Sequence, residues 1–164
     1  MVLNKKRLFY TQGDYGLWQC AKACHPKDLR IMKKPVRKMI AKQQQYENSI
    51  PSLYLICPIC GAPMTMNLRC DDSFVQDHGW YEASQRYKDF IRKYQNMHIL
   101  YLELGVGGNT PVIIKYPFWK MTAQNKKAVY ACVNLEEIIY PKEIEKQSIC
   151  INGDICKVLH DLHN

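Results

Sequence analysis

The sequence predicts an α/β protein in which a small metal-binding module precedes part of a parallel sheet. Two observations lead to this class. Four of the eight cysteines form two closely spaced pairs within the first 60 residues, a pattern typical of metal ligation. After residue 77, short apolar runs alternate with segments of helical periodicity, and this alternation is typical of parallel strands connected by helices.

The size of the chain fits one main domain with a small satellite module. Its 164 residues are 47% hydrophobic, which is enough for a single core. No apolar run approaches the ~20 residues that a membrane-spanning helix needs, and no signal-type stretch follows Met1. We therefore expect a soluble, cytoplasmic protein with no membrane partner.

The net charge of +8 is concentrated near the N-terminus. Residues 1–50 hold 11 of the 23 lysines and arginines but only three of the 15 acidic residues. A basic stretch of this kind is usually a solvated surface. Stacking of nucleic-acid bases would need aromatic side chains among the basic ones, and residues 20–45 contain none. Nucleic acid is therefore a disfavoured partner.

The predicted metal ligands are Cys20, Cys24, Cys57 and Cys60. Three residues separate the first pair and two residues separate the second, so each pair can present two thiolates from a tight turn. Four thiolates complete a tetrahedral zinc shell and leave no position for water, which predicts a structural zinc ion. His25, next to Cys24, remains an alternative ligand. The other four cysteines are expected to be ordinary core residues: Cys70, Cys132, Cys150 and Cys156.

The predicted zinc module spans residues 17–66, and residues 1–16 precede it. The 32 residues between the two cysteine pairs are basic and include a helix-like patch at 35–46 without a strong apolar face. A module with so few apolar residues is expected to need its ion in order to fold. Within residues 1–16, the β-leaning run Arg7–Thr11 is expected to end at a turn formed by Gln12, Gly13 and Asp14.

Residues 67–164 are predicted to form a Rossmann-like parallel sheet with helices. Only about three convincing strands are present, where a doubly wound dinucleotide fold usually has about six, and no Gly-rich phosphate loop lies near the N-terminus. The sheet is therefore expected to be partial. Its predicted elements are a helix at Trp80–Tyr94, a strand at Ile99–Leu104, a helix at Val112–Gln124, strands at Val129–Asn134 and Ile149–Ile151, and a helix from about Gly153.

Three stretches of the sequence together resemble the sirtuin family. They are Tyr10 to Cys20 (YTQGDYGLWQC), Pro63 to Leu68 (PMTMNL) and Glu103 to Gly107 (ELGVG). The resemblance covers nearly the whole chain and is nearest to the macrodomain-linked, or class M, sirtuins. It implies that the chain is the C-terminal half of the Rossmann-like fold. By the same resemblance, we expect a truncated or split protein, for which a separate chain carrying the N-terminal half is a candidate partner.

The resemblance also assigns site residues. Gln12 stands where sirtuins have a catalytic His, and because an amide cannot act as a general base, its implied role is to orient a ribose hydroxyl of NAD. Phe74, within residues 71–77, stands where a sirtuin holds its protein substrate. Taken alone, Gln12 also fits a surface turn and Phe74 a loop aromatic. The implied NAD-binding residues, taken alone, also fit turn glycines, a strand-ending Asn and a helix start. The implied NAD-binding residues are Gly105, Val106, Gly107, Asn109, Asn134 and Ile155.

The implied function is NAD-dependent ADP-ribosyl transfer to a protein, or deacylation, with NAD and a structural zinc as cofactors. A lipoyl-carrier protein is the substrate that the class M resemblance implies. Because the first phosphate-binding loop and part of the active site are missing from the match, the resemblance leaves open whether this chain is an enzyme by itself. The alternative function is a non-catalytic zinc-ribbon module that binds nucleic acid or an acidic protein.

Overall fold

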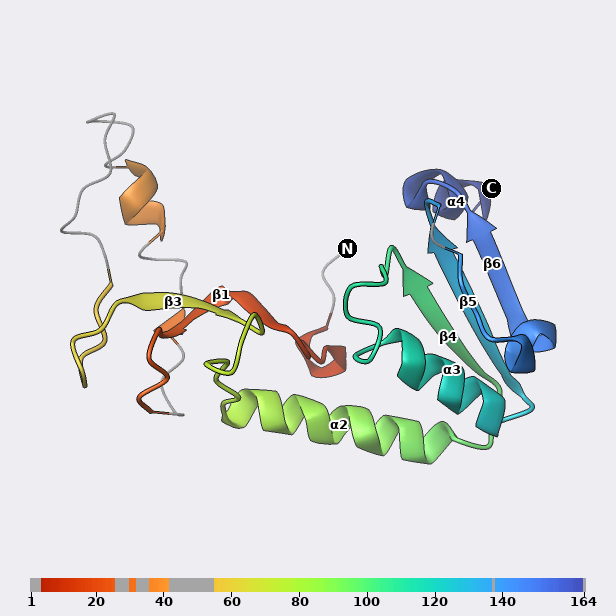
Figure 1. Ribbon diagram of the computed structural model, residues 1–164, viewed down its shortest axis with the longest axis horizontal. Helices are drawn as coiled ribbons and strands as arrows, with labels where there is room; N and C mark the ends of the chain where they lie inside the picture. Colours follow the sequence, from red (N-terminus) through yellow and green to blue (C-terminus); the bar gives the residue numbers. More distant parts are fainter. Residues whose placement is uncertain (1–3, 26–29, 32–35, 42–54, 137, 164) are drawn as a thin grey trace. The chain divides into compact units, whose positions relative to one another are not determined.

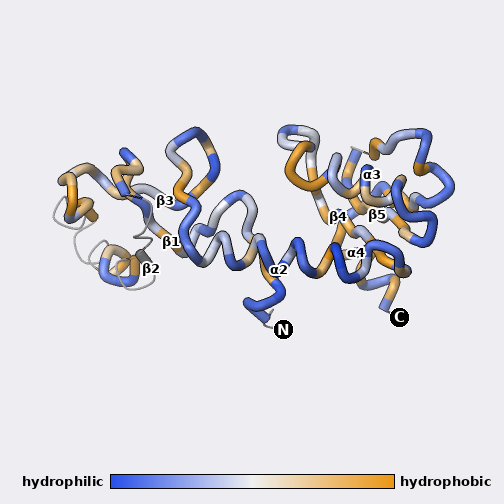
Figure 2. Tube along the Cα trace, turned by 90° about the horizontal axis from the view of Figure 1, so that it is seen from below, coloured by the Kyte–Doolittle hydropathy of each residue, from blue (hydrophilic) through white to orange (hydrophobic). Residues whose placement is uncertain are grey.

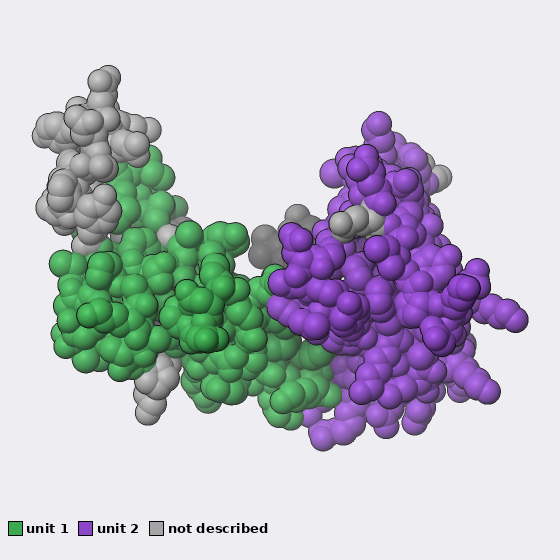
Figure 3. Space-filling model, viewed as in Figure 1, with its two compact units in different colours: residues 1–88 green, residues 89–164 purple. Residues whose placement is uncertain are grey.

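The computed structural model describes residues 4–25, 30–31, 36–41, 55–136 and 138–163. These residues form two compact units, 1–88 and 89–164 (Figure 3). Much of the basic stretch and half of the helix-like patch expected at 35–46 lie outside the described residues, and residues 36–41 of the patch are helical. Among the described residues, no helix is long and apolar enough to cross a membrane.

The first unit contains a three-stranded antiparallel sheet in the order β2-β1-β3, of which Figure 1 labels β1 and β3. Its central strand is β1 (Gly13–Cys20), flanked by β2 (Arg30–Ile31) and β3 (Met64–Leu68). The pairing of β1 with β3 is interrupted by a bulge. Asp14 pairs with Asn67, and the next pair is Trp18 with Met66, so β1 carries three extra residues at this point.

The strand expected at Arg7–Thr11 was wrong. A 3-10 turn (η1) covers Lys5–Arg7 instead, and the strand begins at Gly13, where β3 provides a backbone partner. Between these two elements, Phe9 is held by its side chain. The ring of Phe9 packs against those of Trp80 and Tyr87, at centroid distances of 5.2 and 5.7 Å. Ring packing on a helix therefore replaces sheet pairing here.

Helix α2 (His78–Tyr94) confirms the helix predicted from the spacing of apolar residues. Asp77 fixes its start, because the Asp77 carboxylate accepts a hydrogen bond of 2.8 Å from the backbone N–H of Trp80. A side chain of this type satisfies a backbone donor that the first turn of a helix leaves without a partner. The end of α2 belongs to the second unit, where Ile91 packs against the core.

The second unit contains the predicted parallel sheet, in the order β4-β5-β6 (Figure 1). The strands are β4 (Ile99–Leu104), β5 (Ala128–Asn134) and β6 (Ser148–Asn152). All neighbouring strands are parallel, which confirms the α/β class. The connections are made by α3 (Lys115–Gln124) and the 3-10 helix η3 (Lys142–Gln147), and α4 (Ile155–Asp161) follows β6.

The core of the second unit lies between the sheet and α3. Tyr101, Tyr130 and Cys132 are buried on one face of the sheet, and Phe118 and Trp119 of α3 pack against them. Of the four cysteines expected in the core, Cys132 is buried and Cys150 is half-buried. The expectation was wrong for the other two, because one lies in the turn after β3 and one in the first turn of α4, both exposed: Cys70 and Cys156.

Candidate functional site

The four predicted metal ligands converge in the first unit. The sulfur atoms of Cys20, Cys24, Cys57 and Cys60 all lie within 4.8 Å of one another. Two of the sulfur–sulfur distances are 3.5 Å (Cys20 to Cys60) and 3.6 Å (Cys24 to Cys57). Tetrahedral zinc with Zn–S bonds of about 2.3 Å requires a separation of about 3.8 Å. The donor set and its spacing therefore fit a zinc ion.

The backbone favours the thiolate form of Cys20 and Cys57, whereas burial raises the pKa of Cys24. The backbone N–H groups of Cys24 and then Lys22 point at the Cys20 sulfur and lower the pKa of Cys20 to about 6. The N–H groups of Cys60 and Ile59 likewise lower the pKa of Cys57. Donors aimed at a sulfur stabilise its anionic form, which is the form that binds a metal.

The second cysteine pair forms a tight knuckle. The N–H of Gly61 donates to the carbonyl of Cys57 at 2.9 Å, and the N–H of Cys57 donates to the carbonyl of Ala62 at 2.7 Å. Gly61 has a φ of +69°, a conformation that glycine adopts without strain. This turn places both sulfurs of the pair on the same side.

His25 borders the cluster. Its Nδ1 atom lies 2.8 Å from the Cys24 sulfur and 3.9 Å from the Cys57 sulfur. The distance to the Cys24 sulfur is that of a hydrogen bond, with the donor set by the tautomer of the imidazole. Because the four sulfurs already form the compact set, the geometry favours this hydrogen-bonding role over replacement of a thiolate.

Gln12 and Phe74, the predicted catalytic and substrate residues, lie near each other in the first unit. Gln12 is exposed in the turn that leads into β1, and its carbonyl accepts a 2.9 Å hydrogen bond from the N–H of Arg69. A side chain on the next residue, Gly13, would lie 3.0 Å from the Phe74 ring. The guanidinium of Arg69 lies 4.9 Å from the centre of the same ring. A basic and aromatic surface therefore adjoins Gln12.

A pair of buried amides fixes the segment that carries Phe74. The Gln19 side chain donates to the carbonyl of Ser73 at 2.8 Å and accepts from the N–H of Val75 at 3.0 Å. Asn67 donates to Gln19 at 2.8 Å and to the carbonyl of Val75 at 2.9 Å. Both amides are at least 98% buried. Sequence analysis did not single out this amide pair, although a Gln and an Asn within short strand-like runs were the available signal.

Four of the predicted NAD-binding residues meet at the carboxyl ends of the parallel strands in the second unit. Gly105 follows β4 with a φ of +65°, and a Cβ there would lie 3.2 Å from the Ile155 side chain at the start of α4. Asn134 ends β5, and its amide donates to the carbonyl of Val106 at 3.3 Å. Ligands of open α/β sheets bind at this edge. Gly107 and Asn109 lie exposed further along the same loop.

A buried ion pair anchors this loop at both ends. Lys115, the first residue of α3, donates to the Glu103 carboxylate of β4 at 2.8 Å, and the two side chains are 5% and 0% exposed. A cation at the start of a helix is unfavourable because it faces the positive end of the helix dipole. The negative charge of Glu103 offsets this unfavourable interaction of Lys115. Sequence analysis assigned no role to this pair, although an acidic residue within a buried-type strand was a signal for it.

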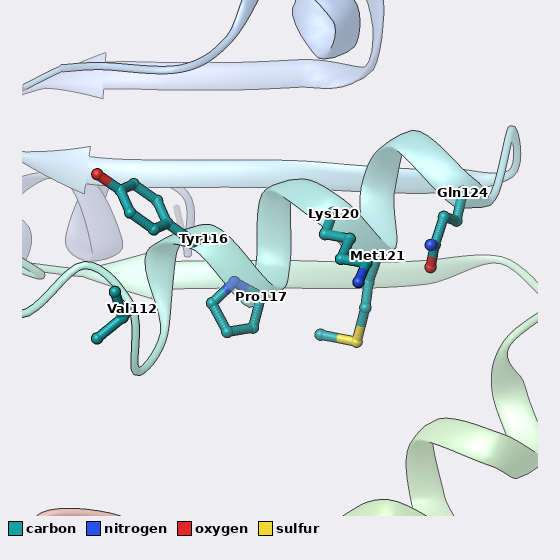
Figure 4. A pocket seen from close by; sticks show the side chains of 6 residues that line it. All are labelled: Val112, Tyr116, Pro117, Lys120, Met121 and Gln124. Atoms are coloured by element: carbon teal, nitrogen blue, oxygen red, sulfur yellow. The ribbon is translucent and has the colours of Figure 1, made fainter.

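A shallow pocket on the outer side of α3 contains none of the predicted site residues (Figure 4). Its volume is about 480 Å³. The lining is mostly apolar. The six residues that line the pocket are labelled in Figure 4: Val112, Tyr116, Pro117, Lys120, Met121 and Gln124. We assign no ligand to it.

The fold is sirtuin-like. It is similar to a solved structure of a Sir2 mutant with a p53 peptide and NAD, with a TM-score of 0.56. The similarity covers 94% of this chain and 54% of that chain, at 13% sequence identity. No family model matches the chain.

Two curated relatives match the sequence. The chain is 35% identical over 154 residues to the Protein ADP-ribosyltransferase of Staphylococcus aureus, and the match covers 93% of this chain and 48% of the relative. It is 27% identical over 169 residues to a Probable bifunctional ADP-ribose hydrolase/ADP-ribosyltransferase of Fusarium oxysporum, with 94% of this chain and 27% of the relative covered. The chain therefore spans about half or less of the length of these relatives.

Proposed function

We propose that this chain takes part in NAD-dependent ADP-ribosyl transfer to a protein. The observation that carries the proposal is the 35% identity to a Protein ADP-ribosyltransferase over 93% of the chain. The sirtuin-like fold supports it. In such a transfer the bond between the ribose and nicotinamide breaks, the acceptor nucleophile forms a bond to the same ribose carbon and loses its proton, and nicotinamide leaves.

Gln12 is the proposed catalytic residue. A neutral amide does not titrate at neutral pH, but it can donate and accept hydrogen bonds and so orient a ribose hydroxyl. This property favours transfer over base-catalysed deacylation. The proximity of Phe74 to Gly13 supports a substrate-binding role for Phe74, because a protein segment held against it would lie near Gln12.

The proposed NAD contacts in the second unit are the residues at the carboxyl edge of the sheet. Asn134 and Val106 are already joined by a hydrogen bond, and Gly105 allows the close approach of Ile155. Backbone groups at such an edge suit the ribose and adenine parts of a dinucleotide. Gly107 and Asn109, on the exposed part of the loop, complete the proposed set.

Zinc is the proposed resident metal, held by the four cysteines. Four thiolates leave no coordination position for water, so the ion would have a structural role and no part in bond breaking. Its effect would be on the position of β1 and the knuckle, because Cys20 ends β1 and Cys57 begins the knuckle.

The test uses labelled NAD and a protein acceptor. The zinc-loaded chain is incubated with a lipoyl-carrier protein, the class M substrate, alone and together with the unmatched half of the Staphylococcus aureus relative, and label on the acceptor is measured. We expect Gln12→Ala to reduce transfer by about 100-fold, because the ribose hydroxyl loses its orientation, whereas the matched control Gln124→Ala, at an exposed glutamine of α3, leaves it unchanged. Transfer that is unaffected by Gln12→Ala would remove Gln12 from the mechanism.

Gln12→His separates the proposed transfer from deacylation. A histidine at this position introduces a titratable base, so we expect deacylase activity to rise with pH through the range in which the imidazole loses its proton. A wild-type chain that deacylates a peptide as fast as the histidine variant would contradict the proposed class M chemistry. Binding to DNA with a steep salt dependence would instead favour the zinc-ribbon alternative.

A further inference from the structure

The loop between β4 and α3, residues 105–114, is closed at its base by the buried ion pair. Glu103 lies next to the last residue of β4, and Lys115 is the first residue of α3. The Lys115 ammonium lies 2.8 Å from the Glu103 carboxylate, and the two side chains are 5% and 0% exposed. The loop carries most of the proposed NAD contacts. The ion pair therefore joins the two points at which the chain enters and leaves that part of the proposed site.

The surroundings of the ion pair are apolar and aromatic. Hydrophobic residues run along β4 and β5 (Figure 2), and the Lys115 ammonium lies 5.9 Å from the centre of the Trp119 ring. The Tyr130 hydroxyl faces Glu103. Burial, and to a smaller extent the Glu103 charge, raises the pKa of Tyr130, so this neighbour stays neutral. Within the described residues, Glu103 thus has Lys115 as its charged partner, and neither charge is exposed to water.

Such a pair contributes little to net stability. The cost of taking two charges out of water is about as large as the attraction between them, and an apolar pair of similar size is often equally stable or more so. Three polar atoms of this cluster are also buried without a well-formed hydrogen bond to a described residue, which is a further cost. They are Oε1 of Glu103, the Tyr130 hydroxyl and Nε1 of Trp119. An ion pair differs from an apolar contact in its geometry, because the two charged atoms must meet at hydrogen-bond distance.

Backbone hydrogen bonds hold the loop at the same two ends. At the β4 end, the N–H of Gly105 donates to the carbonyl of Val133 at 2.9 Å. At the α3 end, the N–H of Tyr116 donates to the carbonyl of Pro111 at 2.8 Å. The middle of the loop, residues 107–110, is exposed. Its position therefore depends on how the two ends are held.

We propose that Glu103 and Lys115 are positioning residues for the proposed NAD site. The ion pair holds the two ends of loop 105–114 at one separation and so keeps the exposed middle in the conformation that receives the dinucleotide. A loop that is ordered before binding loses less conformational entropy when its ligand arrives. The inference rests on the proposed function for the identity of the ligand, and on the ion pair for the order of the loop.

The test replaces the buried ion pair by an apolar pair in the 164-residue chain. We expect Glu103→Leu with Lys115→Met to unfold at nearly the same urea concentration as the wild type. The loop should nevertheless open more readily. Amide exchange at Gly105 and Tyr116, whose N–H groups are hydrogen-bonded, should become at least about tenfold faster, while exchange in β5 stays unchanged. A residue pair with a purely stabilising role would not separate these two measurements.

The matched control is an exposed ion pair of α2, in which Arg92 lies 2.7 Å from Asp89. Asp89→Leu with Arg92→Met makes the same change of chemistry and should leave loop exchange as it is. NAD affinity is measured by calorimetry on the wild type and on both double variants. We expect it to fall by about tenfold or more when the buried pair is replaced, and to stay the same when the exposed pair is replaced.

Two results would overturn the proposal: loop exchange as slow as in the wild type after the buried pair is replaced, and equal acceleration in the loop and in β5 with a lower urea midpoint. If circular dichroism shows that this variant does not fold, Glu103→Gln with Lys115→Met, which is closer in shape, is judged by the same criteria. Equal NAD affinity with and without the pair would also refute the positioning role. A wild-type chain that binds no NAD would contradict the proposed NAD site instead, and exchange alone would then decide whether the pair holds the loop.

Discussion

Replacing Asn67 with alanine tests the amide pair that holds the segment 71–77. The Asn67 side chain donates one hydrogen bond to Gln19 and one to the Val75 carbonyl, at 2.8 and 2.9 Å, and is 1% exposed. Alanine removes both bonds and takes a partner from a buried carbonyl. We expect this change to release the segment that carries Phe74.

The size of the effect follows from these bonds. Each buried hydrogen bond contributes about 1 kcal/mol net, and a buried carbonyl left without a partner costs a further 1–3 kcal/mol or so. We therefore expect Asn67→Ala to destabilise the local structure by about 3–5 kcal/mol. In a double-mutant cycle with Gln19→Ala, the two changes should cost less together than separately, with a coupling of about 1 kcal/mol from their shared hydrogen bond.

The assay is hydrogen exchange followed by mass spectrometry on peptides that cover residues 71–77, which reports the free energy of local opening. The control is Thr65→Val, at an exposed position of the same strand, for which we expect a change within about 0.5 kcal/mol. If Asn67→Ala changes exchange in 71–77 no more than this control does, or if the cycle shows strict additivity, the amide pair does not hold the segment.

Three further changes test other parts of the structure. Gly13→Ala should destabilise the first unit by more than about 1 kcal/mol, measured as a lower melting temperature, because φ is +102° and the new Cβ would meet the Asn67 carbonyl oxygen. Elemental analysis should find one zinc per chain, and a chelator or Cys57→Ser should abolish the ordered knuckle in exchange experiments, whereas Cys156→Ser should change neither. Lys115→Met should cost about 3–5 kcal/mol in urea unfolding because it leaves Glu103 buried without its cation, and the pair Glu103→Leu with Lys115→Met should recover most of that loss.

The sheet and the cysteine cluster were predictable because their signals are local and periodic. The apolar run Ile99–Leu104 and the helical spacing from Trp80 to Tyr94 each determine one element: β4 has the predicted bounds, and α2 begins two residues earlier, at His78. The start of the helix after β4 was placed too early. Val112 was expected to be helical, but α3 begins at Lys115, where the ion pair with Glu103 fixes the chain.

The antiparallel sheet of the first unit was not predictable in the same way. Its central strand begins at Gly13, in a segment that contains turn-forming residues, and it depends on a partner about 50 residues away in β3. The buried amides and the buried ion pair depend on comparable long-range contacts. A polar residue in a short strand-like run is a signal of a buried contact, but the run does not identify the partner, so only the tertiary structure reveals these roles.

The bulge in β1 makes the spacing along this strand important. Past the bulge, two consecutive residues serve two different purposes: Gln19 holds the segment 71–77 on one face, and Cys20 contributes its sulfur to the cysteine cluster. Successive strand residues point to opposite faces, so a slip by one position would exchange the two. If a residue is inserted or deleted at Tyr15–Leu17, the bulge has to change its length by one residue so that Gln19 and Cys20 keep their register with β3. Otherwise the Cys20 sulfur would leave the cysteine cluster and Gln19 would release the segment 71–77 in the same event.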